Sequence, residues 1–193
     1  MTIDEIKTRV GGDYFALMGL PHRFAVDAEL LKKHYLALSR ATHPDFYTGD
    51  PERLAEVLAI SAAVNQAYRT LDDPVRRAEY LLLAHGGKDA GQDKRVPPEM
   101  LGEVLMLNEE IAEAKEANDL RTLTAFRQQM QGRRAAVLKD VEALAARLTE
   151  GGNPASRGDE QTLDALRLEL NAIKYVHNLL VQLGCPASSW GMQ

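Results

Sequence analysis

Apolar residues recur at intervals of three and four along almost the whole chain, and this spacing limits the fold more than any other feature. Leu31, Tyr35 and Leu38 share one helical face. The long segment after Asp50 repeats the pattern with an expected core face of Leu54, Val57, Ser61, Val64, Tyr68 and Leu71. The segment after Leu120 repeats it with Leu123, Phe126, Met130, Val137, Val141, Leu144 and Leu148. No stretch alternates apolar and polar residues in the manner of a half-buried strand. The pattern therefore predicts an all-α protein.

Helix start and stop signals divide the chain into two parts. Pro44 ends one helix and Asp50-Pro51 begins the next. The expected helices cover residues 28–42, 50–71, 75–85, 99–117, 120–148 and 162–183. The first two form an antiparallel hairpin, and the last three form a bundle. Glycine, charge and proline without periodicity fill residues 86–98, so we predict domains over 1–88 and 99–193 joined by a linker over 89–98.

Composition narrows the range of functions. The chain has 193 residues, 45% of them hydrophobic, which is enough for a packed core, and its net charge of −5 argues against a nucleic-acid partner. The single cysteine, Cys185, excludes an internal disulfide and a cysteine-based metal site, and it fits a reducing compartment. No apolar run approaches the ~20 residues of a membrane span. We expect a cytoplasmic protein with no membrane partner.

The tripeptide His43-Pro44-Asp45 has several possible meanings. The simplest is a tight turn, because proline fixes φ and aspartate stabilises the local backbone. An enzymatic interpretation would make His43 a general base oriented by Asp45, but no partnered nucleophile or phosphate-binding loop accompanies it. The remaining histidines are scattered without the spacing of metal ligands. These residues predict neither an enzyme nor a metal or cofactor site.

The surroundings of the tripeptide favour a further interpretation. "DYFALMGL" precedes it, "LKKHYLALSRATHPD" contains it and "VNQAYRTLDDPVRRAEYLL" follows it. In this order and at this spacing, residues 13–84 resemble a J-domain, the module by which DnaJ-type co-chaperones engage a DnaK- or HscA-type ATPase chaperone. The resemblance implies that the turn, with the basic helix before it, triggers ATP hydrolysis in the chaperone.

The same resemblance implies a set of chaperone-binding residues. They are His43, Pro44, Asp45, Lys32, Lys33 and Arg40. Asp45 would offer its carboxylate to a basic group, and the basic side chains would meet an acidic surface. For each basic residue an ordinary solvated helix face is the alternative. Arg76 and Arg77 could extend the basic surface or pair locally. Phe46 departs from the family pattern, in which lysine is common.

Two helices of the second part carry side chains away from their expected core faces. In residues 99–117 the core seam is Met100, Val104, Leu107, Ile111 and Ala114, and a separate stripe is Leu101, Leu105, Glu109 and Glu113. In residues 162–183 the side chains that face away are Leu168, Tyr175 and Leu179. Scattered exposed apolar residues are common, whereas a contiguous patch rimmed by acid would mark a protein-binding site. We expect His177 to be a packed, hydrogen-bonded core residue.

With "PPEMLGEVLMLNEEIAEAKEANDL" and "LRLELNAIKYVHNLL" included, the whole chain resembles the HscB family of iron–sulphur cluster assembly. The resemblance implies a co-chaperone, without enzyme activity or cofactor, that assists cluster maturation and protein folding. Its J-domain would stimulate the chaperone, and its bundle would hold an IscU-type scaffold through Leu101, Leu105, Met106, Glu109, Glu113 and Tyr175. A J-protein with a different client, and a structural helical scaffold with an idle turn, are the alternatives.

Overall fold

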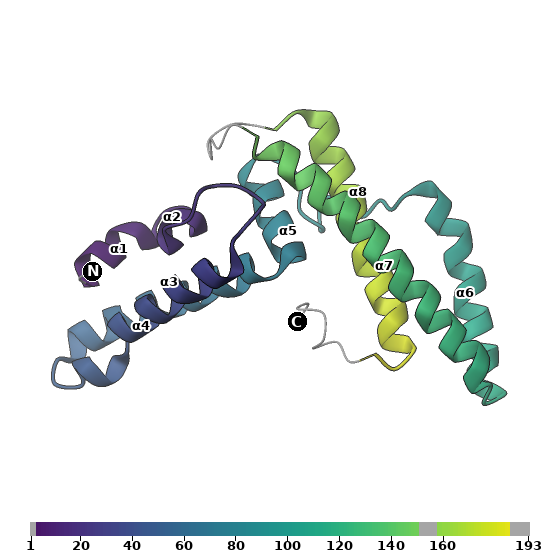
Figure 1. Ribbon diagram of the computed structural model, residues 1–193, viewed down its shortest axis with the longest axis horizontal. Coiled ribbons are helices and arrows are strands. Elements are labelled where there is room, and N and C mark those ends of the chain that lie inside the picture. The colour runs from purple at the N-terminus through teal and green to yellow at the C-terminus, as the bar shows by residue number, and fades with distance from the viewer. Residues whose placement is uncertain (1–2, 151–157, 186–193) are drawn as a thin grey trace. The chain divides into compact units, whose positions relative to one another are not determined.

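The computed structural model describes residues 3–150 and 158–185, without the side chains of Glu99, Leu101, Val104 and Leu105. Over these residues the chain forms helices and no strand, which confirms the all-α class. The elements are α1 (Ile3–Val10), α2 (Tyr14–Met18), α3 (Ala28–Ala41), the 3-10 turn η1 (Pro44–Tyr47), α4 (Pro51–Asp72), α5 (Pro74–Ala84), α6 (Pro98–Glu116), α7 (Leu120–Leu148) and α8 (Glu160–Gln182) (Figure 1). None of the helices in these ranges has the length and apolar character needed to cross a membrane.

All six helices predicted from the sequence form, and their ends differ little from the predicted ones. The apolar pattern does not predict α1, because only two residues of this short helix, Ile3 and Ile6, are buried. The loop expected directly after His43 is instead the single turn η1. Short elements escape detection because they contain too few turns for a period to emerge.

Internal contacts divide the chain into two compact units. The first unit contains the chain up to Tyr80 and a short segment after Leu148, and the second contains Leu81–Leu148 and the C-terminal part with α8. The functional domain boundaries expected at residues 88 and 98 stay a prediction, because compactness does not test which residues carry a function.

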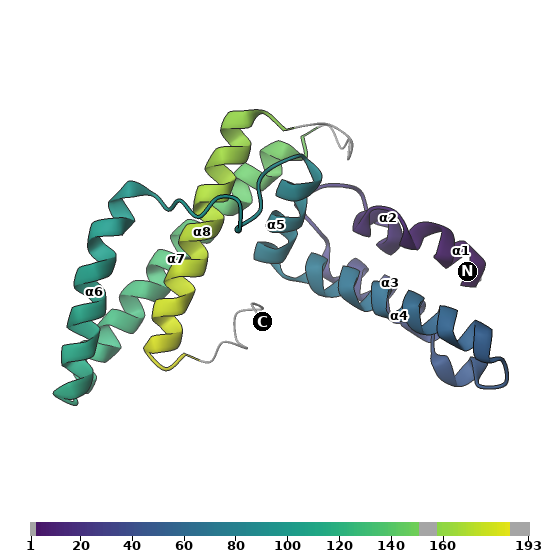
Figure 2. The same cartoon turned by 180° about the vertical axis from the view of Figure 1, so that it is seen from behind.

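The first unit is built around α4, which runs antiparallel to α3 in a long hairpin (Figures 1 and 2). One face of α4 is buried along its length. It consists of Val57, Ile60, Val64, Ala67 and Leu71. This face packs against α1, α2 and α3. Since a fully buried aliphatic side chain contributes roughly 1.5–3 kcal/mol, the seam holds the hairpin as one rigid body.

The buried face of α4 is rotated from the one that the sequence predicts. Leu54, Ser61 and Tyr68, expected in the core, are only half-buried. Tyr68 instead stacks on Tyr35 with the ring centroids 4.1 Å apart. The hydroxyl of Tyr35 donates a 2.9 Å hydrogen bond to Asn65, so the edge of the hairpin interface is partly polar.

A polar network joins the start of α2 to α5. Asp13 caps α2 and accepts a 2.7 Å hydrogen bond from the hydroxyl of Tyr80. The other oxygen of Asp13 lies 3.1 Å from Nδ1 of His22. Tyr80 stacks on Tyr14, and its hydroxyl accepts a bond from the Tyr14 N–H. Burial raises the pKa of Tyr80, so the hydroxyl remains a donor at neutral pH.

The second unit is the predicted three-helix bundle, in which α7 packs against both α6 and α8. The predicted seam of α6 is buried at Met100, Leu107, Ile111 and Ala114, while the Val104 side chain lies outside the described residues. The buried residues of α7 are Met130, Val137, Val141, Ala145 and Leu148. Ala145 replaces the expected Leu144, which is half-buried.

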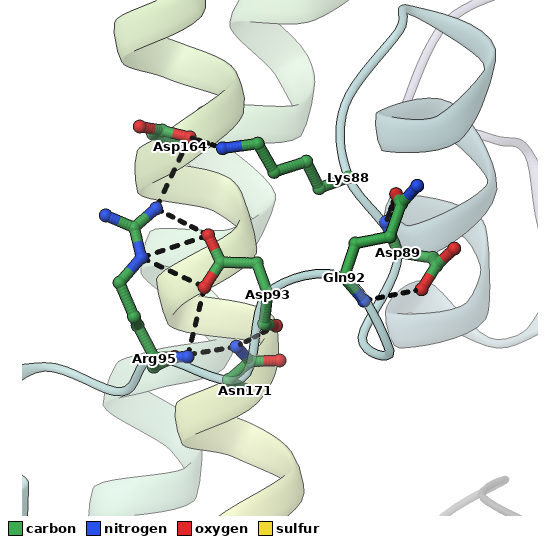
Figure 3. Close-up of polar contacts among 7 residues, drawn as sticks. All are labelled: Lys88, Asp89, Gln92, Asp93, Arg95, Asp164 and Asn171. Carbon is green, nitrogen blue, oxygen red and sulfur yellow. Dashed lines mark hydrogen bonds and ion pairs between the residues drawn. The ribbon is translucent and has the colours of Figure 1, made fainter.

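The expected outward orientation of Leu179 on α8 is wrong, because this side chain is only 2% exposed. More of the surface of α8 is buried than a single apolar face of the helix would predict. Asn171, which lies off that face, donates 3.0 and 2.6 Å hydrogen bonds to the carbonyls of Asp93 and Arg95 (Figure 3). Packing on several sides leaves α8 little outer surface.

The segment from Lys88 to Arg95, which overlaps the predicted linker, is also bound to α8 by ion pairs (Figure 3). The Arg95 guanidinium binds both oxygens of Asp93 and lies 3.5 Å from the carboxylate of Asp164. It holds the pKa of Asp93 well below the usual range. Lys88 lies 3.8 Å from Asp164. We call residues 88–95 the α8 strap.

His177 lies in the bundle core, as predicted, and is only 6% exposed. The expected hydrogen bond is missing at one atom, because Nδ1 has no hydrogen-bond partner among the described residues. Burial, and next the charge of Arg134, lower the pKa of His177 below 6.5. The folded protein therefore disfavours the protonated ring.

We predict that acidification destabilises the bundle through His177. Below about pH 6.5 the unfolded chain takes up a proton at this residue while the folded chain resists it, so stability falls until the lower folded pKa is passed. Urea unfolding at about pH 7.5 and about pH 5.5 should show a smaller pH effect in His177→Leu than in the parent. Equal pH effects in both proteins would contradict the prediction.

Candidate functional sites

The His43-Pro44-Asp45 turn has a backbone fixed by local hydrogen bonds. Thr42 closes α3 by donating from its N–H to the carbonyl of Leu38 at 2.9 Å. Pro44 occupies the first position of η1, where its missing N–H is not needed. Nδ1 of His43 accepts a 3.3 Å bond from the Asp45 N–H, so the neutral ring carries its proton on Nε2. The His43 and Asp45 side chains are 51% and 81% exposed.

The remainder of η1 braces this turn. The hydroxyl of Tyr47 donates a 3.3 Å hydrogen bond back to the carbonyl of Ala41, at the end of α3. The Phe46 N–H donates to the carbonyl of His43 at 3.2 Å. The ring of Phe46 lies edge-on to the His43 ring, with 5.9 Å between centroids. The three predicted residues of the turn are therefore close together and ordered, with His43 and Asp45 exposed and Pro44 half-buried.

The three predicted basic residues lie on the exposed surface of α3. Lys32, Lys33 and Arg40 border a shallow hollow together with Glu29, Leu36 and Ala37. Leu36 is 46% exposed in the middle of this basic surface and was not among the predicted residues. The helical spacing of Lys33, Leu36 and Arg40 could have indicated it.

Arg77 does not extend the basic surface. Its guanidinium lies over the ring of Phe24, 4.7 Å from the centroid, and donates to the carbonyl of Leu71. Arg76, beside it, is half-buried. The local-pairing alternative is therefore the better description of Arg77.

Two other described histidines form contacts inside the first unit. Nδ1 of His34 lies 2.6 Å from the carbonyl of Met18, and His22 pairs with Asp13. Within residues 3–150 and 158–185, no group of three His, Cys, Asp or Glu side chains is arranged to hold a metal ion.

The predicted scaffold-binding residues come from α6 and α8. Met106, Glu109 and Glu113 are exposed on α6, and Met106 is 63% exposed. Their spacing of three and four places them on one face of the helix. Leu101 and Leu105 belong to the same helix, but their side chains lie outside the described residues.

Tyr175 of α8 is linked to α6 through Asn108, which lies on a different face of α6 from Met106, Glu109 and Glu113. Its ring is half-buried, and its hydroxyl accepts a 3.2 Å hydrogen bond from the side-chain amide of Asn108. Tyr175 also borders a hollow with Lys174, Asn178 and Lys94. Neither Asn108 nor these polar neighbours were predicted, because the sequence pattern marks apolar and acidic positions and carries no signal for a contact between two helices.

Comparison with known proteins matches both parts of the chain. The DnaJ domain family model matches residues 13–80, and the model of the HSCB C-terminal oligomerisation domain matches residues 96–184. The co-chaperone protein HscB of Proteus mirabilis is 34% identical over 115 residues, which are 58% of this chain and 66% of that protein. That alignment thus spans just under two thirds of the relative.

Two solved structures share the fold. Chaperone HscB from Vibrio cholerae matches with a TM-score of 0.70 and 28% identity, over 90% of this chain and 96% of that one. The human co-chaperone protein HscB matches with a TM-score of 0.72 over 90% and 81% of the two chains, but at 23% identity this likeness bears on the fold alone. A J-domain followed by this particular C-terminal domain shows that the chain belongs to the HscB family of J-domain co-chaperones.

Proposed function

We propose that this chain binds an IscU-type iron–sulphur scaffold and stimulates the ATPase of an HscA/DnaK-type chaperone, and so assists cluster maturation and protein folding in the cytoplasm. The observation that best supports this proposal is the ordered turn, in which His43 and Asp45 are exposed at the end of a rigid hairpin. Because the turn is already ordered, binding costs little conformational entropy. The chemistry of ATP hydrolysis belongs to the partner, so this chain acts without being an enzyme.

Charge supports the choice of an ATPase chaperone as the partner of the first unit. The Asp45 carboxylate is 81% exposed and can accept charge-assisted hydrogen bonds from a basic group. Nδ1 of His43 lies 3.5 Å from that carboxylate, which stays exposed to a partner. Lys32, Lys33 and Arg40 would approach an acidic surface and raise the rate of encounter.

An apolar and acidic surface supports a protein client for the second unit. Met106 is exposed between acidic neighbours on α6, and Tyr175 of α8 is held beside that helix by Asn108. An aromatic side chain with one hydrogen-bonded end and one open face is a common interface anchor. Leu101 and Leu105 join this surface on the grounds of the family resemblance.

Replacing His43 by Gln should abolish stimulation of the chaperone ATPase and leave folding intact, because His43 is half exposed and outside the core. Steady-state ATP hydrolysis by the chaperone with increasing amounts of the variant measures the effect. Asp45→Asn, which keeps the size of the side chain but removes its charge, should also lose stimulation. Full stimulation by the His43→Gln protein would make the trigger assignment wrong.

The combined variant K32Q/K33Q/R40Q should need roughly tenfold more protein for half-maximal stimulation at low salt, because it lacks long-range attraction to an acidic surface. The difference should shrink at high salt, where exposed charges are screened. The matched control R9Q/R23Q/R69Q removes the same charge from other exposed positions of the first unit. If the control needs an equally large increase in concentration for half-maximal stimulation, net charge and not the α3 surface explains the effect.

Calorimetry with a purified IscU-type scaffold tests the second unit. Truncating buried interface anchors costs more than about 1 kcal/mol each, so L101A/L105A/Y175A should weaken binding by at least ~100-fold. The control L120A/V181A alters exposed apolar residues elsewhere in the unit and should bind like the parent. No binding by the parent would favour a co-chaperone with a different client.

A further inference from the structure

Phe46 is the most exposed large hydrophobic residue in the described part of the chain, with 74% of its surface accessible. A single exposed apolar side chain is ordinary on a soluble protein. Phe46 differs from such scatter because it follows Asp45 directly and contacts His43, both of which belong to the proposed trigger. Its place next to two exposed polar side chains requires a separate explanation.

The position of Phe46 is well defined. Its N–H is bound to the carbonyl of His43 at 3.2 Å, and the next residue, Tyr47, is tied back to Ala41. The turn closes with a 3.1 Å bond from the Asp50 N–H to the carbonyl of Tyr47. An aromatic ring with two χ angles on an ordered backbone loses little conformational freedom when it is buried by a partner.

We propose that Phe46 is an affinity-determining contact that inserts into an apolar surface of the ATPase chaperone beside the basic group that receives Asp45. This inference rests on the proposed function and deepens it. The partner surface would combine an apolar site for the ring, a basic group for the carboxylate and acidic groups for the α3 lysines. A central aromatic anchor with charged groups around it is the usual arrangement of a specific protein interface.

The test is chaperone ATPase stimulation measured against increasing concentration of the full-length chain. Phe46→Ala and Phe46→Lys should each raise the concentration for half-maximal stimulation roughly tenfold, about 1.4 kcal/mol, with the maximum unchanged. Phe46→Leu should stay close to the parent because it keeps an apolar side chain. Leu58→Ala, an exposed apolar residue of the same unit, is the matched control.

Salt separates an apolar contact from a charge effect. The ratio between the parent and Phe46→Ala should be the same at low and high salt, since apolar burial is not screened. Phe46→Lys acting as well as the parent, or Phe46→Ala acting as well as the parent, would overturn the inference while the trigger assignment stands. A parent chain that gives no stimulation at any concentration would overturn the proposed function and this inference together.

Discussion

Burial of the apolar face of α4 is the interaction on which the first unit depends. Val57, Ile60 and Val64 lie at the spacing that keeps one side of the helix against its neighbours. Three other helices pack on this face, so the hairpin end cannot move freely with respect to the rest of the unit. No residue of the exposed turn η1 is fully buried, and the turn takes its rigidity from its packing against α4 and from a few backbone hydrogen bonds. A core far from the turn thus decides how precisely His43 and Asp45 are presented.

The second unit is also built from amphipathic helices, and polar contacts help to position them. The proposed binding surface takes side chains from two helices, and the hydrogen bond between Asn108 and Tyr175 links α6 to α8 directly. The α8 strap is bound to α8 through Asn171, which lies one helical turn before Tyr175. Polar side chains therefore set positions in a bundle whose apolar core alone would tolerate sliding. These polar contacts hold Tyr175 in a defined position.

Sequence pattern predicted the long helices well because each contains several turns of apolar period. It failed at α1, where Ile3 and Ile6 are the whole signal, and at Leu179, because a helix packed on several sides has no single core face. The turn residues and the basic surface of α3 followed from motif and resemblance. The contact of Asn108 and the contacts of the strap could not be predicted, since they depend on which elements become neighbours in space.

The α8 strap also changes how the protein can be divided. A fragment that starts at Glu99, where the predicted bundle domain begins, would lack the carbonyls of Asp93 and Arg95 that receive the side-chain amide of Asn171. That amide is almost fully buried, at 8% exposed, and a buried donor without a partner costs roughly 1–3 kcal/mol. Asp164 would lose both of its cationic neighbours as well. A fragment of the C-terminal half that keeps all of these contacts must therefore include Lys88. The α8 strap, which the sequence predicts as mostly linker, belongs structurally to the second unit.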